Sequence, residues 1–364
     1  MVEWKKLGDF AMLQKTKNRK HVTENAYSIT QAGLVPTKSF FKEKTNITSN
    51  DTSGYYIVEK EWFVYSPSRI DVGSISYLKD EGPVIVSPID VVFSIDKTVC
   101  LPSFLLNYFF TYQGRRDLLR NREGVEGTGR RSLPFSAIQN MLIPVPLPQE
   151  QKQILKKLDT FTSSIENLKE QIAQRRKQYE YYRDQLLDLA GKEGVEMKIS
   201  DFCLLKAGKS ISADNILEKK IGNVFPCIGG NGTRGYVSQY SHDGAYPVIG
   251  RQGALCGCVN WIKGKFYATE HAVVATGKDN MDQRFLFYLF ENADLNQYKT
   301  QGAQPGLSVA KLNEIRFQIP SLTEQQRIVS ILDPFEASIR NLEQQLAQRE
   351  KQYEFYRNKL LTFE

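Results

Sequence analysis

The chain has 364 residues, of which 41% are apolar and 24% charged, a composition typical of an ordinary globular protein and not of a disordered or fibrous one. This length predicts two or more domains with separate cores. No apolar run is long enough to span a membrane, and the start of the chain lacks the apolar core of a signal peptide, so we expect no membrane partner. The five cysteines have no framework spacing, which favours a reducing cytoplasm.

The net charge is +7, and most of it lies outside two segments that prove to be repeats. Residues 150–189 carry eight basic and seven acidic side chains, and residues 324–363 carry six of each. Subtracting +1 and 0 from +7 leaves +6 on the rest of the chain. A basic excess on the globular parts is weak support for a polyanionic partner such as nucleic acid.

The first predicted domain, residues 1–148, mixes strands and helices. β-rich runs bounded by turn residues predict strands at 55–57, 62–65 and 84–86. Helical spacing of apolar residues predicts one helix over 102–119, and a shorter helix is expected over 136–141. The closing run IPVPLP alternates proline, which we expect to exclude both helix and strand pairing.

A long helix with a 3.5-residue apolar period follows at 149–190 and recurs at 323–364. The offset between Glu150 and Glu324 is 174 residues, and about half of the positions are identical. Such a period predicts coiled-coil packing, and 40 residues correspond to roughly 60 Å of helix. The predicted seam includes Ile165, Leu168, Ile172, Arg175, Tyr179, Ile339, Leu342, Leu346, Arg349 and Tyr353.

Arg175 and Arg349 are the polar exceptions in this apolar seam. A polar seam residue costs stability but fixes register, so its presence in both copies suggests that the two helices pack on each other. The alternative is that both arginines extend past their neighbours and specify nothing.

The second predicted domain, residues 191–322, repeats the first at its two ends and diverges in between. Its middle consists of short β-rich runs separated by glycine-containing turns, which predict a strongly curved sheet or partial barrel. Residues 283–291 predict a short buried helix that matches the helix near 105–112.

Motifs for catalysis, cofactors or metals fail on their context. Gly230–Gly235 fits G-x-G-x-x-G, but the following residues alternate as a strand where a dinucleotide site needs a helix. Ala207–Ser210 resembles the end of a P-loop, but Cys203 stands where the first glycine is required. Cys256 and Cys258 lack the paired spacing of a zinc site. We therefore expect no catalytic residue, no metal and no cofactor in this chain.

Glycine-rich and arginine-rich loops remain as candidates for binding double-stranded DNA. Arg, Asn and Gln suit guanine and adenine edges, glycine allows close approach of the backbone, and further arginines suit phosphates. Any one of these residues could instead be an ordinary solvated loop residue. The predicted DNA-binding residues are Arg115, Arg116, Arg130, Arg131, Asn231, Arg234, Tyr236, Arg251 and Gln252.

Several motifs resemble one known family. IPVPLPQEQKQI and IPSLTEQQRI at the heads of the long helices, YPVIGRQGALCG with FYATEHAVV, and the closing LLTFE are similar to the specificity subunit of type I restriction-modification enzymes. The resemblance covers the whole chain. It implies an α+β fold in which two globular target-recognition domains, each a curved β-sheet with small helices, are separated by two long antiparallel coiled-coil helices with pseudo-two-fold symmetry. Pro334 departs from the first copy and predicts a kink or a fresh helix start.

The resemblance also implies a function and partners. Each domain would read one half of a bipartite DNA target, while the coil sets the spacer and docks two methyltransferase subunits. S-adenosylmethionine would be bound by that partner, and translocation and cleavage would belong to a restriction subunit, all in a prokaryotic cytoplasm. The alternatives are a self-contained DNA methyltransferase or nuclease, for which no motif is found, and a coiled-coil scaffold that binds no nucleic acid.

Overall fold

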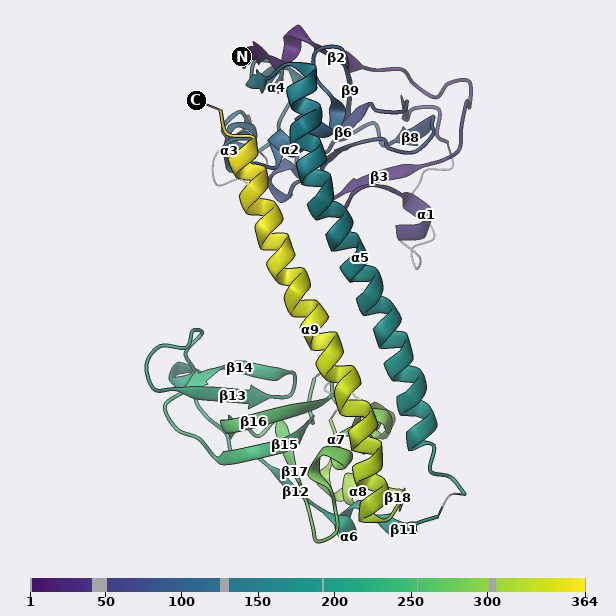
Figure 1. Ribbon diagram of the computed structural model, residues 1–364, viewed down its shortest axis with the longest axis vertical. Helices are drawn as coiled ribbons and strands as arrows, with labels where there is room; N and C mark the ends of the chain where they lie inside the picture. Colours follow the sequence, from purple (N-terminus) through teal and green to yellow (C-terminus); the bar gives the residue numbers. More distant parts are fainter. Residues whose placement is uncertain are drawn as a thin grey trace. The chain divides into compact units, whose positions relative to one another are not determined.

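The structure, a computed structural model, describes residues 2–40, 51–124, 131–191, 193–253, 255–300 and 306–363. The chain forms two compact units, of which unit 1 comprises Met1–Leu168 and Gln345–Glu364 and unit 2 comprises Lys169–Gln344. The division therefore runs through both long helices, α5 (Pro148–Leu187) and α9 (Leu322–Leu360), which are teal and yellow in Figure 1. The four-part division at the helix ends stays a prediction.

Unit 1 is built on a four-stranded antiparallel sheet of order β2-β9-β6-β7, with three two-stranded sheets, β1–β10, β3–β4 and β5–β8. Its core packs Phe63 and Phe93 of the sheet against Phe104 and Tyr108, and Leu158 of α5 joins the same cluster. Its strands are β1 (Glu3–Lys6), β2 (Ala11–Gln14), β3 (Tyr27–Thr30), β4 (Gly33–Pro36), β5 (Tyr56–Val58), β6 (Phe63–Tyr65), β7 (Ile75–Tyr77), β8 (Val84–Val86), β9 (Val91–Ile95) and β10 (Leu142–Val145). Its short helices are α1 (Thr37–Phe40), α2 (Pro102–Phe109), α3 (Tyr112–Arg120) and α4 (Phe135–Ile138).

Unit 2 is built on a six-stranded sheet of order β12-β17-β15-β16-β13-β14, in which only the β13–β16 pair is parallel among the described pairings. The buried helix α7 packs on this sheet and contributes Phe285, Leu286 and Leu289 to a core that also holds Ile328 and Leu332 of α9. Its strands are β11 (Val195–Lys198), β12 (Cys203–Ala207), β13 (Phe225–Gly229), β14 (Gly232–Val237), β15 (His242–Gly250), β16 (Val259–Ala268), β17 (Ala272–Gly277) and β18 (Arg316–Ile319). Its short helices are α6 (Ile199–Phe202), α7 (Gln283–Asn292) and α8 (Val309–Asn313).

The long helices pack on each other within each unit through equivalent residues. In unit 1 the rings of Phe161 and Tyr356 stack with centroids 5.1 Å apart, and in unit 2 the rings of Tyr182 and Phe335 lie 5.3 Å apart. These are the same two positions, since 161 + 174 = 335 and 182 + 174 = 356. Unit 2 also pairs Arg176 with Glu343. Because the α9 number rises as the α5 number falls, the helices are antiparallel there.

The predicted seam residues line these helix contacts to different degrees. Ile165, Leu168, Ile172 and Tyr179 are buried. The remaining predicted seam residues are half-buried, namely Arg175, Ile339, Leu342, Leu346, Arg349 and Tyr353.

Both seam arginines reach across to the other helix. The Arg175 guanidinium lies 5.7 Å from the Phe335 ring, and the Arg349 guanidinium lies 5.8 Å from the Phe161 ring. Each also donates to a glutamine three residues on, at 3.2 Å for Gln178 and 3.0 Å for Gln352. The two arginines therefore make the same contacts in both copies, which favours the register interpretation over the alternative that they specify nothing.

Four local predictions need correction. The helix expected over 102–119 is two helices, because Thr111 begins a new one and its hydroxyl accepts the Gly114 N–H at 3.0 Å. The IPVPLP run does pair, since β10 lies against β1 with Pro144 opposite Trp4, which a two-stranded sheet tolerates at an edge. Residues 136–141 form only the short α4, and α9 continues through Pro334 without a fresh start.

Candidate nucleic-acid interface

Two glycine-rich loops of unit 2 lie in backbone contact. A Cβ atom on Gly250 would lie 1.9 Å from the Gly230 carbonyl oxygen, and a Cβ on Gly230 would lie 2.8 Å from the Gln252 carbonyl oxygen. Only glycine allows this approach, because any side chain would collide with backbone atoms. The β13–β14 turn and the segment after β15 are thereby held side by side.

A hollow of about 580 Å³ opens where these loops meet. Three of the predicted DNA-binding residues, Asn231, Arg234 and Gln252, line it together and are exposed. Sequence reasoning missed two further lining side chains, Thr233 and His271. Thr233 lies within the GGNGTRGY loop and could have been included, whereas His271 is distant in sequence and gave no signal for this role.

The G-x-G-x-x-G match at Gly230–Gly235 belongs to this hollow and not to a dinucleotide fold. The predicted strand after it is confirmed as β14 (Gly232–Val237), which pairs with β13. No helix follows to direct its N-terminus at a pyrophosphate, so the loop presents side chains at the end of a hairpin.

Tyr236 and Arg251 do not line the hollow. Tyr236 is half-buried, and its backbone exchanges two hydrogen bonds of 2.8 Å with Leu217. Arg251 donates its backbone N–H to the His271 carbonyl at 3.0 Å, and its own carbonyl accepts the Leu307 N–H at 2.8 Å. Arg251 thus anchors the loop through its backbone, a role that residue type cannot reveal.

Unit 1 has a basic hollow of about 550 Å³ along α3. It is lined by Arg115, Arg116 and Arg131, with Arg120 and the exposed Tyr112 and Leu119 beside them. Three predicted residues therefore meet here, while Arg130 lies outside the described residues. One nitrogen of Arg115 donates to the Asp71 carbonyl at 2.9 Å. Four arginine side chains around one hollow form a positively charged surface suited to phosphate groups.

The helix that carries this basic hollow is attached to α9. The Tyr112 N–H donates to Asn358 Oδ1 at 2.7 Å at the start of α3, and the Tyr353 hydroxyl donates to Asn107 Oδ1 of α2 at 2.8 Å. The Arg357 guanidinium also lies 5.8 Å from the Phe110 ring, at the break between α2 and α3. Neutral hydrogen bonds and ring contacts thus fix α3 on the long helix.

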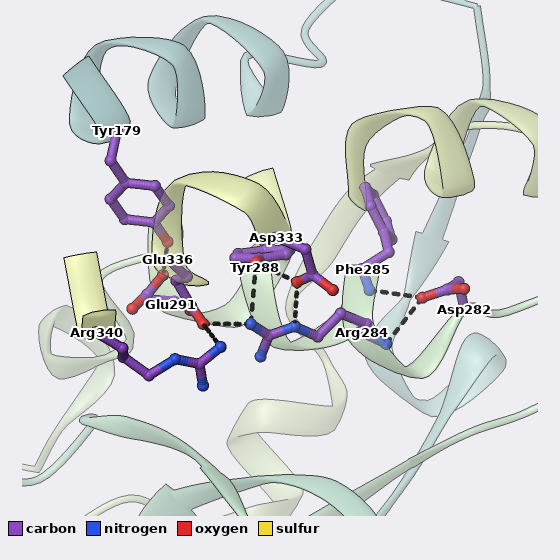
Figure 2. Close-up of polar contacts among 9 residues, drawn as sticks. All are labelled: Tyr179, Asp282, Arg284, Phe285, Tyr288, Glu291, Asp333, Glu336 and Arg340. Carbon is purple, nitrogen blue, oxygen red and sulfur yellow. Dashed lines mark hydrogen bonds and ion pairs between the residues drawn. The ribbon is translucent and has the colours of Figure 1, made fainter. Parts of the chain in front are cut away.

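Unit 2 attaches α7 to the long helices through a charged cluster, which Figure 2 shows. Arg284 donates from Nε to Asp333 Oδ1 at 2.6 Å and from Nη2 to Glu336. The Tyr288 hydroxyl donates to the same Asp333 oxygen at 2.6 Å. The Arg284 guanidinium also packs on the rings of Trp261, Phe287 and Tyr288, each less than 5 Å away.

The same cluster reaches α5 through Tyr179. Its hydroxyl donates to Glu291 Oε2 at 2.6 Å. Burial raises the pKa of the Glu291 carboxyl, and the hydrogen bond from Tyr179 only partly opposes this. Burial likewise raises the pKa of Tyr179. The helix beneath the recognition sheet is therefore joined to both long helices by buried polar groups.

The lining of the two hollows favours binding over reaction. Among the described lining side chains, neither hollow includes a carboxylate or a cysteine. Across the described residues, no group of three His, Cys, Asp or Glu side chains is arranged to hold a metal ion. Among the described helices, none has both the length and the apolar character that crossing a membrane requires.

Known proteins share this chain's sequence pattern and fold. A specificity subunit of the type I restriction enzyme EcoprrI of Escherichia coli is 41% identical over 219 residues, which is 56% of this chain and 55% of that protein. A putative type I restriction enzyme specificity subunit of Haemophilus influenzae is 34% identical over 154 residues, 39% of this chain and 40% of that protein. The chain thus spans about half the length of these curated relatives.

A solved structure of a type I restriction-modification system S subunit from M. genitalium superposes with a TM-score of 0.64 at 14% identity, covering 100% of this chain and 97% of that one. A second, from a study of complex assembly and conformational transition of the type I restriction-modification system, gives 0.60 at 15% identity, covering 99% of this chain and 97% of that one. At these identities the likeness establishes the fold alone. The family model described as type I restriction modification DNA specificity domain matches residues 1–175 and 192–351, and the chain belongs to this family.

Proposed function

We propose that this chain is the non-catalytic DNA-specificity subunit of a type I restriction-modification complex. The observation that carries the proposal is that a duplicated chain of this family has two unlike hollows lined by basic and hydrogen-bonding side chains. Two unlike readers suit a bipartite target whose two halves differ in sequence.

Each unit would read one half of the double-stranded target. In unit 2, Asn231 and Gln252 have amides that match adenine, and Arg234 matches guanine. In unit 1, the arginines along α3 match backbone phosphates, which fix position on the duplex without reading its sequence. This division of roles predicts different effects for mutations in the two hollows.

The long helices would set the spacing between the two half-targets and dock two methyltransferase subunits, which in turn bind the restriction subunits. Both α5 and α9 contribute residues to each unit, which supports a role for the helices in spacing. S-adenosylmethionine would be bound by the methyltransferase partner and not by this chain. DNA as the substrate places the complex in the cytoplasm of a prokaryote.

The test is a genome-wide map of methylated adenines in cells that produce this chain with its methyltransferase partner. We expect one bipartite motif with a fixed spacer. Arg234→Ala should relax one half of the motif and leave the other unchanged. Inserting one helical turn within 150–189 should change the spacer length and neither half-sequence; altered half-sequences at constant spacing would contradict the proposal.

The competing function is a self-contained DNA methyltransferase or nuclease. It predicts that the purified chain alone binds S-adenosylmethionine or modifies DNA. Incubation of the chain with labelled S-adenosylmethionine and target DNA separates the two, because the specificity subunit should transfer no label until the methyltransferase subunit is added.

A further inference from the structure

The duplication within this chain allows its two long helices to be compared position by position. Residues that are exposed in both copies have no burial to preserve them, so they are free to diverge unless something outside the helix selects them. Between 148 and 166, and again at 185, every position that is exposed in both copies differs from its partner 174 residues later. These nine positions are 148, 149, 152, 153, 156, 160, 163, 166 and 185.

The exposed positions between 167 and 182 behave in the opposite way. Ten positions there are exposed in both copies, and seven of them carry identical residues. An eighth carries an aromatic ring in both, Tyr181 and Phe355. Only positions 170 and 176 differ, and at 176 the side chain is engaged within the molecule, where Arg176 pairs with Glu343.

Four of these retained positions form one patch in each copy. The Tyr181 patch comprises Gln174, Lys177, Glu180 and Tyr181 on the part of α5 that belongs to unit 2. The Phe355 patch comprises Gln348, Lys351, Glu354 and Phe355 on the part of α9 that belongs to unit 1. Positions 174, 177 and 181 follow a spacing of three and four, which places them on one face of a helix.

Each patch exposes a large aromatic ring at its end. Tyr181 is 63% exposed and Phe355 is 60% exposed, whereas their neighbours Tyr182 and Tyr356 contact Phe335 and Phe161 of the other helix. Keeping such a ring in water at the same position of both copies contributes nothing to the core. Exposed aromatic residues beside a lysine stem and amides are typical of the centre of a protein–protein interface.

The charge of the patches argues against DNA as the occupant. Each patch holds one lysine and one glutamate, so its formal charge is zero. A DNA-binding surface needs an excess of positive charge, as the arginine hollow of unit 1 has, whereas a patch of balanced charge suits a protein surface. Because the patch is present twice, its occupant should also be present twice.

We propose that the Tyr181 patch and the Phe355 patch each dock one methyltransferase subunit, and that they are the two equivalent attachment points for that partner on this chain. The inference rests on the proposed function for the identity of the partner. The patches themselves follow from exposure and from identity between the two copies.

The experiment measures how many methyltransferase subunits bind the full-length chain. The chain is co-produced with the methyltransferase subunit of its own system, and the complex is weighed by native mass spectrometry. Lys177→Ala with Tyr181→Ala should leave one bound subunit, as should Lys351→Ala with Phe355→Ala, and the fourfold variant should leave none. Affinity at each altered patch should fall at least about tenfold, the effect of removing an aromatic anchor.

Matched controls come from the chain itself. Gln185→Ala and Lys359→Ala alter an exposed pair that has diverged between the copies, and both should retain two subunits. Tyr181→Phe and Phe355→Tyr exchange the residues that the two copies already carry and should also retain two. Circular dichroism should be the same for all variants, because the altered side chains are exposed. If a double-alanine variant nevertheless fails to fold, Tyr181→Gln and Phe355→Gln replace it.

Two subunits bound to the fourfold variant with unchanged affinity would overturn the proposal. Loss of both subunits from a single-patch variant that folds normally would overturn it too, because the patches are proposed as separate attachment points. DNA binding by the isolated chain should be unchanged in every variant. A parent chain that shows no DNA selectivity would count against the proposed function and would leave the result on docking to stand by itself.

Discussion

Gln151 and Gln325, which are 174 residues apart, are both fully buried and make the same three hydrogen bonds in their respective units. In each case Oε1 accepts, at 2.8 Å, the N–H of the residue that caps a domain helix, Leu101 before α2 and Asp282 before α7. In each case Nε2 donates to two backbone carbonyls, one of which belongs to the proline five residues before the glutamine. One side chain at the start of each long helix thus fixes a domain helix.

Gln325→Leu should destabilise unit 2 strongly, because the Asp282 N–H and two carbonyls lose their partner in a buried place. We expect a loss of about 3–5 kcal/mol in the free energy of unfolding. Urea denaturation of the full chain measures it. Gln326→Leu, at the exposed neighbouring position, is the control and should change stability by less than about 0.5 kcal/mol.

Arg284→Met should also destabilise unit 2, by about 3 kcal/mol, because Asp333 and Glu336 would face each other without their shared cation. Arg340→Met is the matched control. Arg340 is 55% exposed and reaches Glu336 only at 3.8 Å, so its loss should cost less than about 1 kcal/mol. Equal losses for the two variants in thermal or urea unfolding would show that Arg284 is not the centre of the cluster.

Gly250→Ala should disrupt the hollow of unit 2, since the new Cβ would lie 1.9 Å from the Gly230 carbonyl oxygen. We expect a stability loss of about 2 kcal/mol or more, together with weaker binding to target DNA. Gly229→Ala lies in the same loop, and its Cβ would meet no atom closer than 3.8 Å. It should leave stability nearly unchanged, and a matching loss there would mean that the contact between the two loops is not the cause.

Arg115→Gln combined with Arg116→Gln should weaken DNA binding to a similar extent for every sequence. If both arginines contact phosphates, the slope of log K against log salt should become shallower by about 1.8, or 0.9 per contact. Fluorescence anisotropy over a series of salt concentrations measures the slope. An unchanged slope, or a change confined to one target sequence, would mean that these arginines do not contact phosphates.

Asp90 should make unit 1 less stable as the pH rises. Burial raises the pKa of its carboxyl to about 7, whereas in the unfolded chain it ionises near 4. Between these values the unfolded state releases a proton that the folded state retains, so stability is full below about pH 4 and falls as the pH rises toward 7. Asp90→Asn should therefore gain stability relative to the parent chain at pH 8 and gain little at pH 4.

Asp96→Asn provides the contrast for the Asp90 experiment. Asp96 is exposed and accepts hydrogen bonds from the Thr98 hydroxyl and N–H, which lower its pKa. Its contribution to stability is present above its unfolded pKa and is lost as the pH falls. Urea unfolding at pH 4 and pH 8 should thus show Asp90→Asn and Asp96→Asn diverging with pH, and parallel behaviour would contradict the assignment.

The sequence by itself determined the features that depend on local periodicity. The constant offset of 174 residues and the 3.5-residue apolar period predicted two long helices, and residues such as Ile165 and Tyr179 were expected where burial is now observed. The same pattern identified Arg175 and Arg349 as exceptions in the seam. Periodic patterns of this kind survive because each turn of a long helix repeats the same burial requirement.

Only the tertiary structure decided which loop residues meet. Asn231 and Gln252 line one hollow because Gly230 and Gly250 allow their backbones to touch, and Arg115 meets Arg131 because α3 is fixed on α9. Arg251 and Tyr236 looked equivalent to these residues in sequence but serve mainly through their backbones. The pairing of Pro144 and the start of α3 at Thr111 were likewise missed. Such outcomes depend on contacts between residues distant in the chain, for which local residue preferences carry no information.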